Sequence, residues 1–181
     1  MKQNIHNSAH FSAAILGDVR LPTGDENDFL GSGTTGVKPF LALSFKQGRV
    51  APHVNIGYQW NGESTLAGNL STGAKASLPD QFFYSLGTEI SLHQNFTLAT
   101  DWIGQRVFDG TRVTETKASV SGASYNGLSF PTQTFSMNNI AVGFKYSIAN
   151  RFLATVNASM AVDRGGLRQR VTPLVGISYL F

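Results

Sequence analysis

The chain has 181 residues, of which 41% are hydrophobic and 14% are charged, and its formal net charge is +3. A soluble domain usually carries about 25% charged residues; here 19 Gly and many Ser, Thr and Asn stand in place of the missing charge. This composition excludes a helical membrane protein, which needs spans of about 20 mostly apolar residues. The 13 Phe, 5 Tyr and 2 Trp argue against disorder, and the absence of Cys excludes disulfide scaffolds and thiolate metal sites.

The positive charge is scattered along the chain, and only Arg164, Arg168 and Arg170 cluster. A nucleic-acid-binding surface needs a basic stripe or patch on one face. We therefore expect no nucleic-acid partner.

Apolar and polar residues alternate with a period of two, which is typical of β-strands and not of helices. The pattern is clearest at residues 50–61, where Ile56 and Trp60 fall on one face and Asn55 and Gln59 on the other. We predict eight strands, in chain order at residues 10–22, 37–46, 50–61, 82–93, 96–108, 136–148, 152–163 and 171–181.

The connections between these strands alternate between short and long. Short turns are predicted at residues 46–49, 93–95 and 149–151, and long loops at 23–36, 62–80, 109–135 and 163–170. The loops are rich in Gly, Ser, Thr, Asn and Asp, the residues that turns prefer. In an up-and-down meander, alternate connections lie at the same end, so one end should carry short turns and the other long loops.

Two architectures fit such strands. A soluble sandwich turns its apolar face inward, whereas a transmembrane barrel turns its apolar face to lipid and its polar face to a lumen. The polar face here is rich in small residues and poor in Lys and Glu, which favours the barrel, because a water-facing sheet usually carries more charge. We predict an all-β fold: one domain over residues 1–181, an antiparallel up-and-down transmembrane β-barrel.

Aromatic residues on the apolar face lie near strand ends, where amphipathic rings favour the membrane–water interface. Tyr58, Trp60, Phe82, Tyr84 and Phe108 lie next to long loops, and Phe45, Phe96, Tyr146, Phe152, Tyr179 and Phe181 next to short turns or the C-terminus. The last strand, with Val175, Ile177, Tyr179 and Phe181 in alternation, resembles the signal by which bacterial outer-membrane barrels are recognised for insertion.

The polar face provides the candidate site residues. We predict that nine of them face the lumen: Asp18, Arg20, Lys38, His53, Asn55, Gln59, Glu89, Asp101 and Lys145. Charges there should pair, because an unpaired charge in a narrow lumen costs several kcal/mol. Two interpretations stay open: a structural ion-pair network that plugs or shapes the lumen, or a polar lining along a solute path.

Other motifs carry little chemistry. The acidic run at residues 25–28 lacks the carboxylate spacing of a Ca²⁺ loop, and we interpret it as a solvated loop. The four histidines, His6, His10, His53 and His93, lie on different segments without ligand spacing, and no Ser-His-Asp arrangement is legible. We expect no metal, no cofactor and no enzymatic activity.

One segment contains motifs that are more specific than the alternating pattern of the strands. Residues 20–25 read Arg-Leu-Pro-Thr-Gly-Asp, residues 30–33 read Leu-Gly-Ser-Gly, and residues 52–62 read Pro-His-Val-Asn-Ile-Gly-Tyr-Gln-Trp-Asn-Gly. This segment resembles the outer-membrane family named after the meta pathway of phenol degradation, whose members are labelled as transporters. The resemblance runs through to Phe181, with the middle loops poorly matched.

Members of that family are longer and begin with a signal peptide and further strands. The resemblance therefore implies that this chain lacks an export signal and some N-terminal strands. Eight strands are enough for a small closed barrel, and a barrel of about twelve is the alternative. The difference matters because about eight strands leave an interior just filled by side chains, whereas a larger barrel can leave a channel.

These observations give three functional hypotheses. The first is a passive outer-membrane channel for small apolar or aromatic compounds, with outer-membrane lipid, the barrel assembly machinery and a small-molecule solute as its partners. The second is a non-transporting structural or adhesive outer-membrane barrel that uses the loops at 62–80 and 109–135. The third is a soluble β-sandwich binding module.

Overall fold

The computed structural model describes residues 2–26, 28, 30–69, 71–120, 123–148, 151–165 and 168–179. The described part of the chain is built from β-strands and their connections, without a helix. Nine strands form the main sheet: β1 (Lys2–Asn7), β2 (Phe11–Arg20), β3 (Gly36–Phe45), β4 (Val50–Asn61), β7 (Gln81–His93), β8 (Phe96–Thr111), β11 (Thr132–Ile148), β12 (Phe152–Ala161) and β13 (Val171–Tyr179). The predicted all-β class is confirmed.

No helix long and apolar enough to cross a membrane occurs among the described residues.

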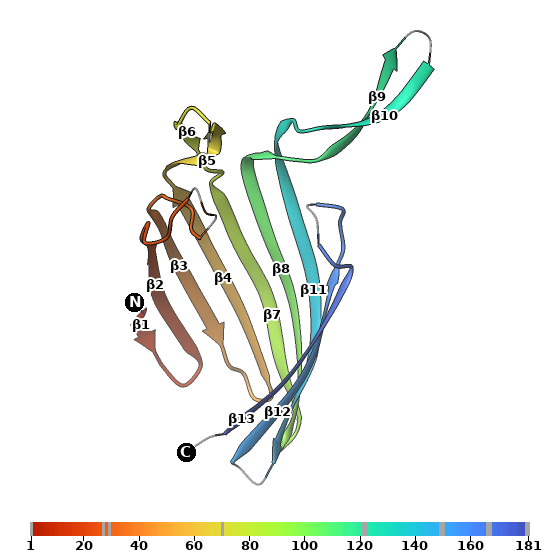
Figure 1. Ribbon diagram of the computed structural model, residues 1–181. Coiled ribbons are helices and arrows are strands. Elements are labelled where there is room, and N and C mark those ends of the chain that lie inside the picture. The colour runs from red at the N-terminus through yellow and green to blue at the C-terminus, as the bar shows by residue number, and fades with distance from the viewer. Residues whose placement is uncertain are drawn as a thin grey trace.

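The main sheet is an antiparallel meander. Its strands pair in the order in which they occur in the chain, β1-β2-β3-β4-β7-β8-β11-β12-β13 (Figure 1). The eight predicted strands are all present, and β4 matches its predicted range of 50–61. The alternating pattern located these strands because each one has an apolar and a polar face.

The strand count differs from the prediction. The structure adds β1, which pairs with β2 through contacts such as Lys2 with Leu16 and Asn7 with Ser12. The segment has Ile5 as its one large apolar residue, so no alternation marks it. It becomes a strand because the backbone of β2 supplies hydrogen-bond partners, which is a tertiary effect that local sequence does not record.

The sheet is also open, not closed. Figure 1 shows a strongly twisted sheet, and among the described residues the edge strand β1 pairs only with β2 and the edge strand β13 only with β12. The predicted closed barrel is therefore corrected to a nine-stranded open sheet for the residues that the structure describes. Because nine antiparallel strands alternate in direction, β1 and β13 run the same way, so they have no antiparallel pairing to offer one another.

The two ends of the sheet are unlike, as predicted. Tight connections follow β3 and β7, while the longer ones between β2 and β3 and between β12 and β13 lie at the opposite end. Two of the predicted loops are corrected, because they contain hairpins: β5 (Glu63–Asn69) with β6 (Ala74–Ser77), and β9 (Thr114–Val120) with β10 (Ala123–Ser129). The β9–β10 hairpin projects beyond the end of the sheet (Figure 1).

One face of the sheet is apolar and exposed. A register row crosses four strands from Leu86 through Trp102 and Ile140 to Met160, and these side chains are between 41% and 57% exposed. Among the described residues, the buried apolar side chains are Ala13, Ala14, Ala99 and Val107. The sheet therefore has almost no core of its own, and the described part of the chain provides no second layer over its large apolar residues.

The opposite face is small and polar. The neighbouring register row runs from Ser44 through His53, Gly87 and Asp101 to Ala141. Successive side chains on a strand point to opposite faces, so these residues lie behind the apolar row. This face carries the candidate site.

Candidate functional site

The nine predicted site residues lie on one face of the main sheet, which we call the polar face. His53 on β4 and Asp101 on β8 meet there, with a distance of 2.7 Å from Nε2 to Oδ1. They reach one another across β7 because Gly87 lies between them: a Cβ on Gly87 would be 2.1 Å from the Asp101 oxygen. A glycine in the middle of a strand often marks such a close approach.

Two more contacts join strands on the polar face, one across β8 and one between the neighbouring strands β4 and β7. Lys145 on β11 donates to Glu89 on β7 with Nζ 2.5 Å from Oε1, although 56 residues separate them in the chain. Asn55 donates from Nδ2 to the Ser85 hydroxyl at 2.9 Å. Both side chains of the Lys145–Glu89 pair are about one-third exposed, so water screens the attraction and its net contribution is about 0–1 kcal/mol.

The remaining predicted residues line one pocket near the long-loop end. Its walls are Asp18 and Arg20 on β2, Gly36 and Lys38 on β3, and Gln59 on β4, and its volume is about 100 Å³. Asn61, which the sequence did not single out, accepts from both Arg20 Nη2 at 2.8 Å and Gln59 Nε2 at 2.9 Å.

Two aromatic rings stand beside this pocket on the polar face. The Lys38 ammonium lies 5.2 Å from the ring centroid of Phe40 and 5.4 Å from that of Phe83. The two centroids are 6.0 Å apart. Gly57 lies in register between them, and a Cβ there would come within 2.4 Å of the Phe40 ring. Phe40 and Phe83 were not among the predicted site residues, and their sequence signal was the presence of two large aromatic residues on a face of mostly small and polar residues.

The residues assigned to membrane insertion lie at the sheet edge. Val175, Ile177 and Tyr179 share the apolar side of β13 and are all more than half exposed. The Tyr179 ring lies 5.1 Å from that of Phe152 on β12. Phe181 lies outside the described residues.

The aromatic residues of the apolar face meet in clusters near both ends of the sheet. Tyr58 contacts Trp60 and Phe108 near the long-loop end, with centroid distances of 4.7 and 6.0 Å. Near the short turns, the pairs are Phe11 with Phe45 at 4.7 Å and Phe96 with Phe144 at 5.4 Å.

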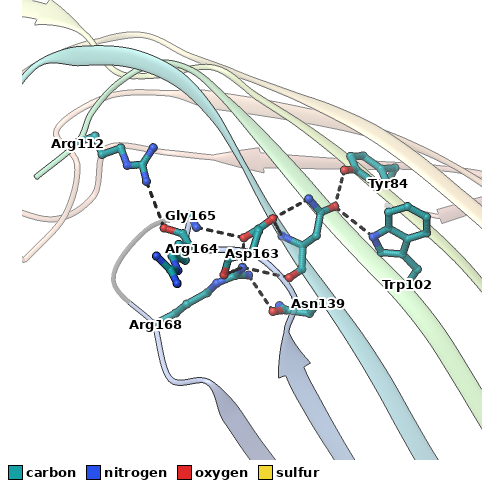
Figure 2. A network of polar contacts seen from close by, with 9 residues as sticks. Tyr84, Trp102, Arg112, Asn139, Asp163, Arg164, Gly165 and Arg168 are labelled. Atoms are coloured by element: carbon teal, nitrogen blue, oxygen red, sulfur yellow. Dashed lines mark hydrogen bonds and ion pairs between the residues drawn. The ribbon is translucent and has the colours of Figure 1, made fainter. Parts of the chain in front are cut away.

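A second polar group, which sequence analysis missed, surrounds the loop between β12 and β13 (Figure 2). Asp163 accepts hydrogen bonds from the backbone N–H and the side-chain amide of Asn138, both at 2.8 Å, and it pairs with Arg168. Arg168 also donates to the backbone carbonyl of Asn138 at 3.0 Å and to Asn139 Oδ1 at 2.8 Å. The clustering of Arg164, Arg168 and Arg170 was the available signal.

This group continues to the apolar face. The Asn138 side-chain oxygen accepts from Tyr84 Oη at 2.6 Å and from Trp102 Nε1 at 3.1 Å. β12 ends at Ala161, opposite Asn139. Among the described residues, the edge of β11 beyond that point has no strand partner, although the Val162 N–H still donates to the Asn138 carbonyl at 3.0 Å. Asp163 and Arg168 hydrogen-bond to the backbone N–H and carbonyl of Asn138 there. We call these two residues the clasp of the β12–β13 loop, because they hold the loop against β11.

The Asp163 pKa lies below its ordinary value. Partial burial of the carboxyl opposes ionisation, but hydrogen bonds from Asn138 and Gly165 and the charge of Arg168 together outweigh it. The folded loop therefore favours the ionised carboxylate.

Glu26 forms another unpredicted contact. Its carboxylate accepts from the Ser64 hydroxyl at 3.1 Å and the Thr65 N–H at 3.3 Å, and Lys75 lies 3.6 Å away. The acidic run was interpreted as solvated, but the Glu26 side chain is only 15% exposed. Burial raises its pKa, and the bonds from Thr65 and Ser64 and the charge of Lys75 lower it by more, so that the net shift is downward.

Replacing Glu26 with alanine should release the β5–β6 hairpin from the loop between β2 and β3. The Ser64 hydroxyl and the Thr65 N–H would lose their acceptor, and unpartnered polar groups are costly only while they stay buried, so we expect the segment to open. Hydrogen exchange at Thr65 should accelerate while amides of β4 and β7 keep their rates. Unchanged exchange at Thr65 would contradict this role.

The described residues contain no group of three or more His, Asp or Glu side chains that could hold a metal ion. The polar face instead offers paired charges, amides and a cationic pocket, which can orient solutes and water by hydrogen bonds.

A comparison with curated proteins finds no match for this chain. The model of the family described as "Putative MetA-pathway of phenol degradation" matches residues 1–166, which include every strand except β13. The match therefore extends well beyond the motifs at residues 20–62 and ends before the expected limit at Phe181, and the chain belongs to this family.

Proposed function

We propose that this chain forms a channel in the bacterial outer membrane through which small solutes pass passively. One observation carries the proposal: a single sheet exposes large apolar side chains on one face and holds paired charges, amides and small residues on the other. A water-soluble sheet would cover its apolar face with a second layer. In lipid, that face turns outward and the polar face lines a lumen.

The strands and their aromatic residues support the membrane location. Apart from β1, each strand of the main sheet has at least nine residues, and a tilted strand crosses a bilayer with about 9–11. The aromatic clusters near both ends of the sheet suit the two membrane–water interfaces. The alternating Val175, Ile177 and Tyr179 on β13 suit recognition by the barrel assembly machinery.

Closure is part of the proposal. Lipid offers no hydrogen-bond partner, so the free edges of β1 and β13 must both be paired in the membrane. If β1 and β13 paired directly, they would be parallel. A closed barrel in which all neighbours are antiparallel has an even number of strands, so an odd number of further strands would have to join these nine. The family description associates the chain with phenol degradation, which favours aromatic solutes by association and not by geometry.

Conductance in planar bilayers tests the channel with a matched pair of variants. Ala141 faces the polar side of β11, and its neighbour Ile140 faces the apolar side. Ala141→Trp should lower the conductance by obstructing the lumen, whereas Ile140→Trp should leave it unchanged because its side chain points to lipid. A wild-type protein that folds into the bilayer and passes no ions would refute the proposal.

One observation favours a second function, adhesion to another macromolecule. The β9–β10 hairpin projects beyond the sheet (Figure 1), and Tyr125 and Leu128 on β10 are exposed. If adhesion is the function, removing residues 113–130 should abolish binding to its partner while leaving folding into lipid vesicles unchanged.

A further inference from the structure

We propose that the pocket between β2, β3 and β4 is a binding site for small aromatic carboxylates. The inference rests on the proposed channel function and names the class of solute that its polar face selects.

The pocket is positively charged. Arg20 and Lys38 contribute two cations and Asp18 contributes one carboxylate. Asp18 neutralises Lys38 only weakly, because their closest atoms are 3.9 Å apart and the Asp18 side chain is 66% exposed to water. An anion is therefore the favoured occupant. Planar guanidinium groups bind carboxylates in a forked geometry. The Arg20 guanidinium has five N–H donors, and Asn61 accepts from its Nη2.

The space fits a carboxylate group. The pocket volume of about 100 Å³ leaves room for a carboxylate group beside Arg20 and Lys38. Gly36 keeps this space open, because a Cβ there would lie 3.2 Å from Arg20 Nη2.

The rings of Phe40 and Phe83 provide the adjoining surface. Both centroids lie within 5.4 Å of the Lys38 ammonium, so a ligand whose carboxylate reaches Lys38 places its next atoms over these rings. Offset or edge-to-face contact between aromatic rings is favourable. Gly57 permits this arrangement by leaving room for Phe40. A carboxylate attached directly to an aromatic ring meets both features at once.

Fluorine NMR titration of 4-fluorobenzoate tests the site on the full chain, folded in nonionic detergent micelles. We expect saturable binding that Arg20→Gln and Lys38→Gln each weaken about tenfold, the effect of one lost charge-assisted interaction. Phe83→Leu, which keeps both charges, should weaken it by a smaller factor. Lys46→Gln, which removes a cation from the turn at the opposite end of the sheet, should leave the affinity unchanged.

Competing ligands identify the chemistry. Benzoate should displace the probe at much lower concentration than acetate, which lacks the ring, or benzyl alcohol, which lacks the charge. Equal potency of any of these, or an effect of Lys46→Gln as large as that of Arg20→Gln, overturns the site. Conductance without saturable binding rejects this site and leaves the channel standing; saturable binding without conductance rejects the channel and leaves the site.

Discussion

Replacing Leu86 with arginine should prevent the protein from folding into lipid vesicles. Leu86 lies in the middle of β7 on the apolar face, is 57% exposed and is flanked by Val54 and Trp102. A positive charge on the lipid-facing side of a barrel strand costs about 2–4 kcal/mol near the bilayer midplane. The folded fraction, measured by the heat-dependent shift on a denaturing gel, should fall to a small part of the wild-type value.

The matched control is Leu128→Arg. Leu128 is similarly exposed, at 64%, but it lies in the β9–β10 hairpin that projects beyond the sheet (Figure 1). The same substitution there should leave folding into vesicles unchanged. The soluble-sandwich hypothesis also buries Leu86, so the wild-type protein separates the two: folding without detergent into a soluble monomer, with no heat-dependent gel shift, would exclude the membrane location.

Much of the fold could be predicted because each long strand has two unlike faces. Residues 50–61 illustrate this, since strict alternation over twelve residues leaves neither the strand nor its polar face in doubt. The hairpins were missed because Thr114, Thr116 and Tyr125, which favour strands, stand among the Gly, Ser and Asn that indicate loops. The open sheet could not be predicted, because strand pairing depends on long-range contacts and not on local pattern.

The sequence predicted which residues lie in the candidate site, but not which of them contact one another. The alternating pattern predicts that Glu89 and Lys145 lie on the polar face of the sheet. Their contact, however, depends on the register of β7, β8 and β11. Gly87 and Gly57 were passed over as small residues, although they leave the space in which His53 meets Asp101 and Phe40 lies flat. Glycine roles of this kind become visible only when the neighbouring strand is in place.

The clasp of the β12–β13 loop was harder still to predict. Asn138 and Asn139 point to opposite faces, and Arg168 contacts both residues, so no single-face pattern marks the group. Asp163 was placed at a strand end, where a solvated carboxylate is ordinary. Its importance follows from the early end of β12, which leaves the backbone of β11 to be satisfied by the loop.

Replacing Asp163 with alanine should release this loop from β11. The substitution removes the acceptor for the Asn138 N–H and amide and for the Gly165 N–H, and it leaves the Arg168 guanidinium without its carboxylate. A buried hydrogen-bond donor that loses its acceptor costs about 1–3 kcal/mol of folding free energy. Hydrogen-exchange protection of the backbone N–H of Asn138 should therefore fall by roughly tenfold or more. The control is Arg164→Gln, which should leave this protection unchanged because Arg164 takes part in the network through its backbone carbonyl.

Acid should reproduce this effect in the wild type. Because the folded Asp163 pKa lies below its ordinary value, ionisation stabilises the folded loop. That stabilisation is complete above about pH 4, the usual range of an unfolded aspartate, and it is lost as the pH falls through the lower folded pKa. Protection of the Asn138 amide should decrease in that window in the wild type and stay flat in Asp163→Asn, which keeps an acceptor oxygen but cannot ionise. An equal pH dependence in Asp163→Asn would show that another group controls the loop.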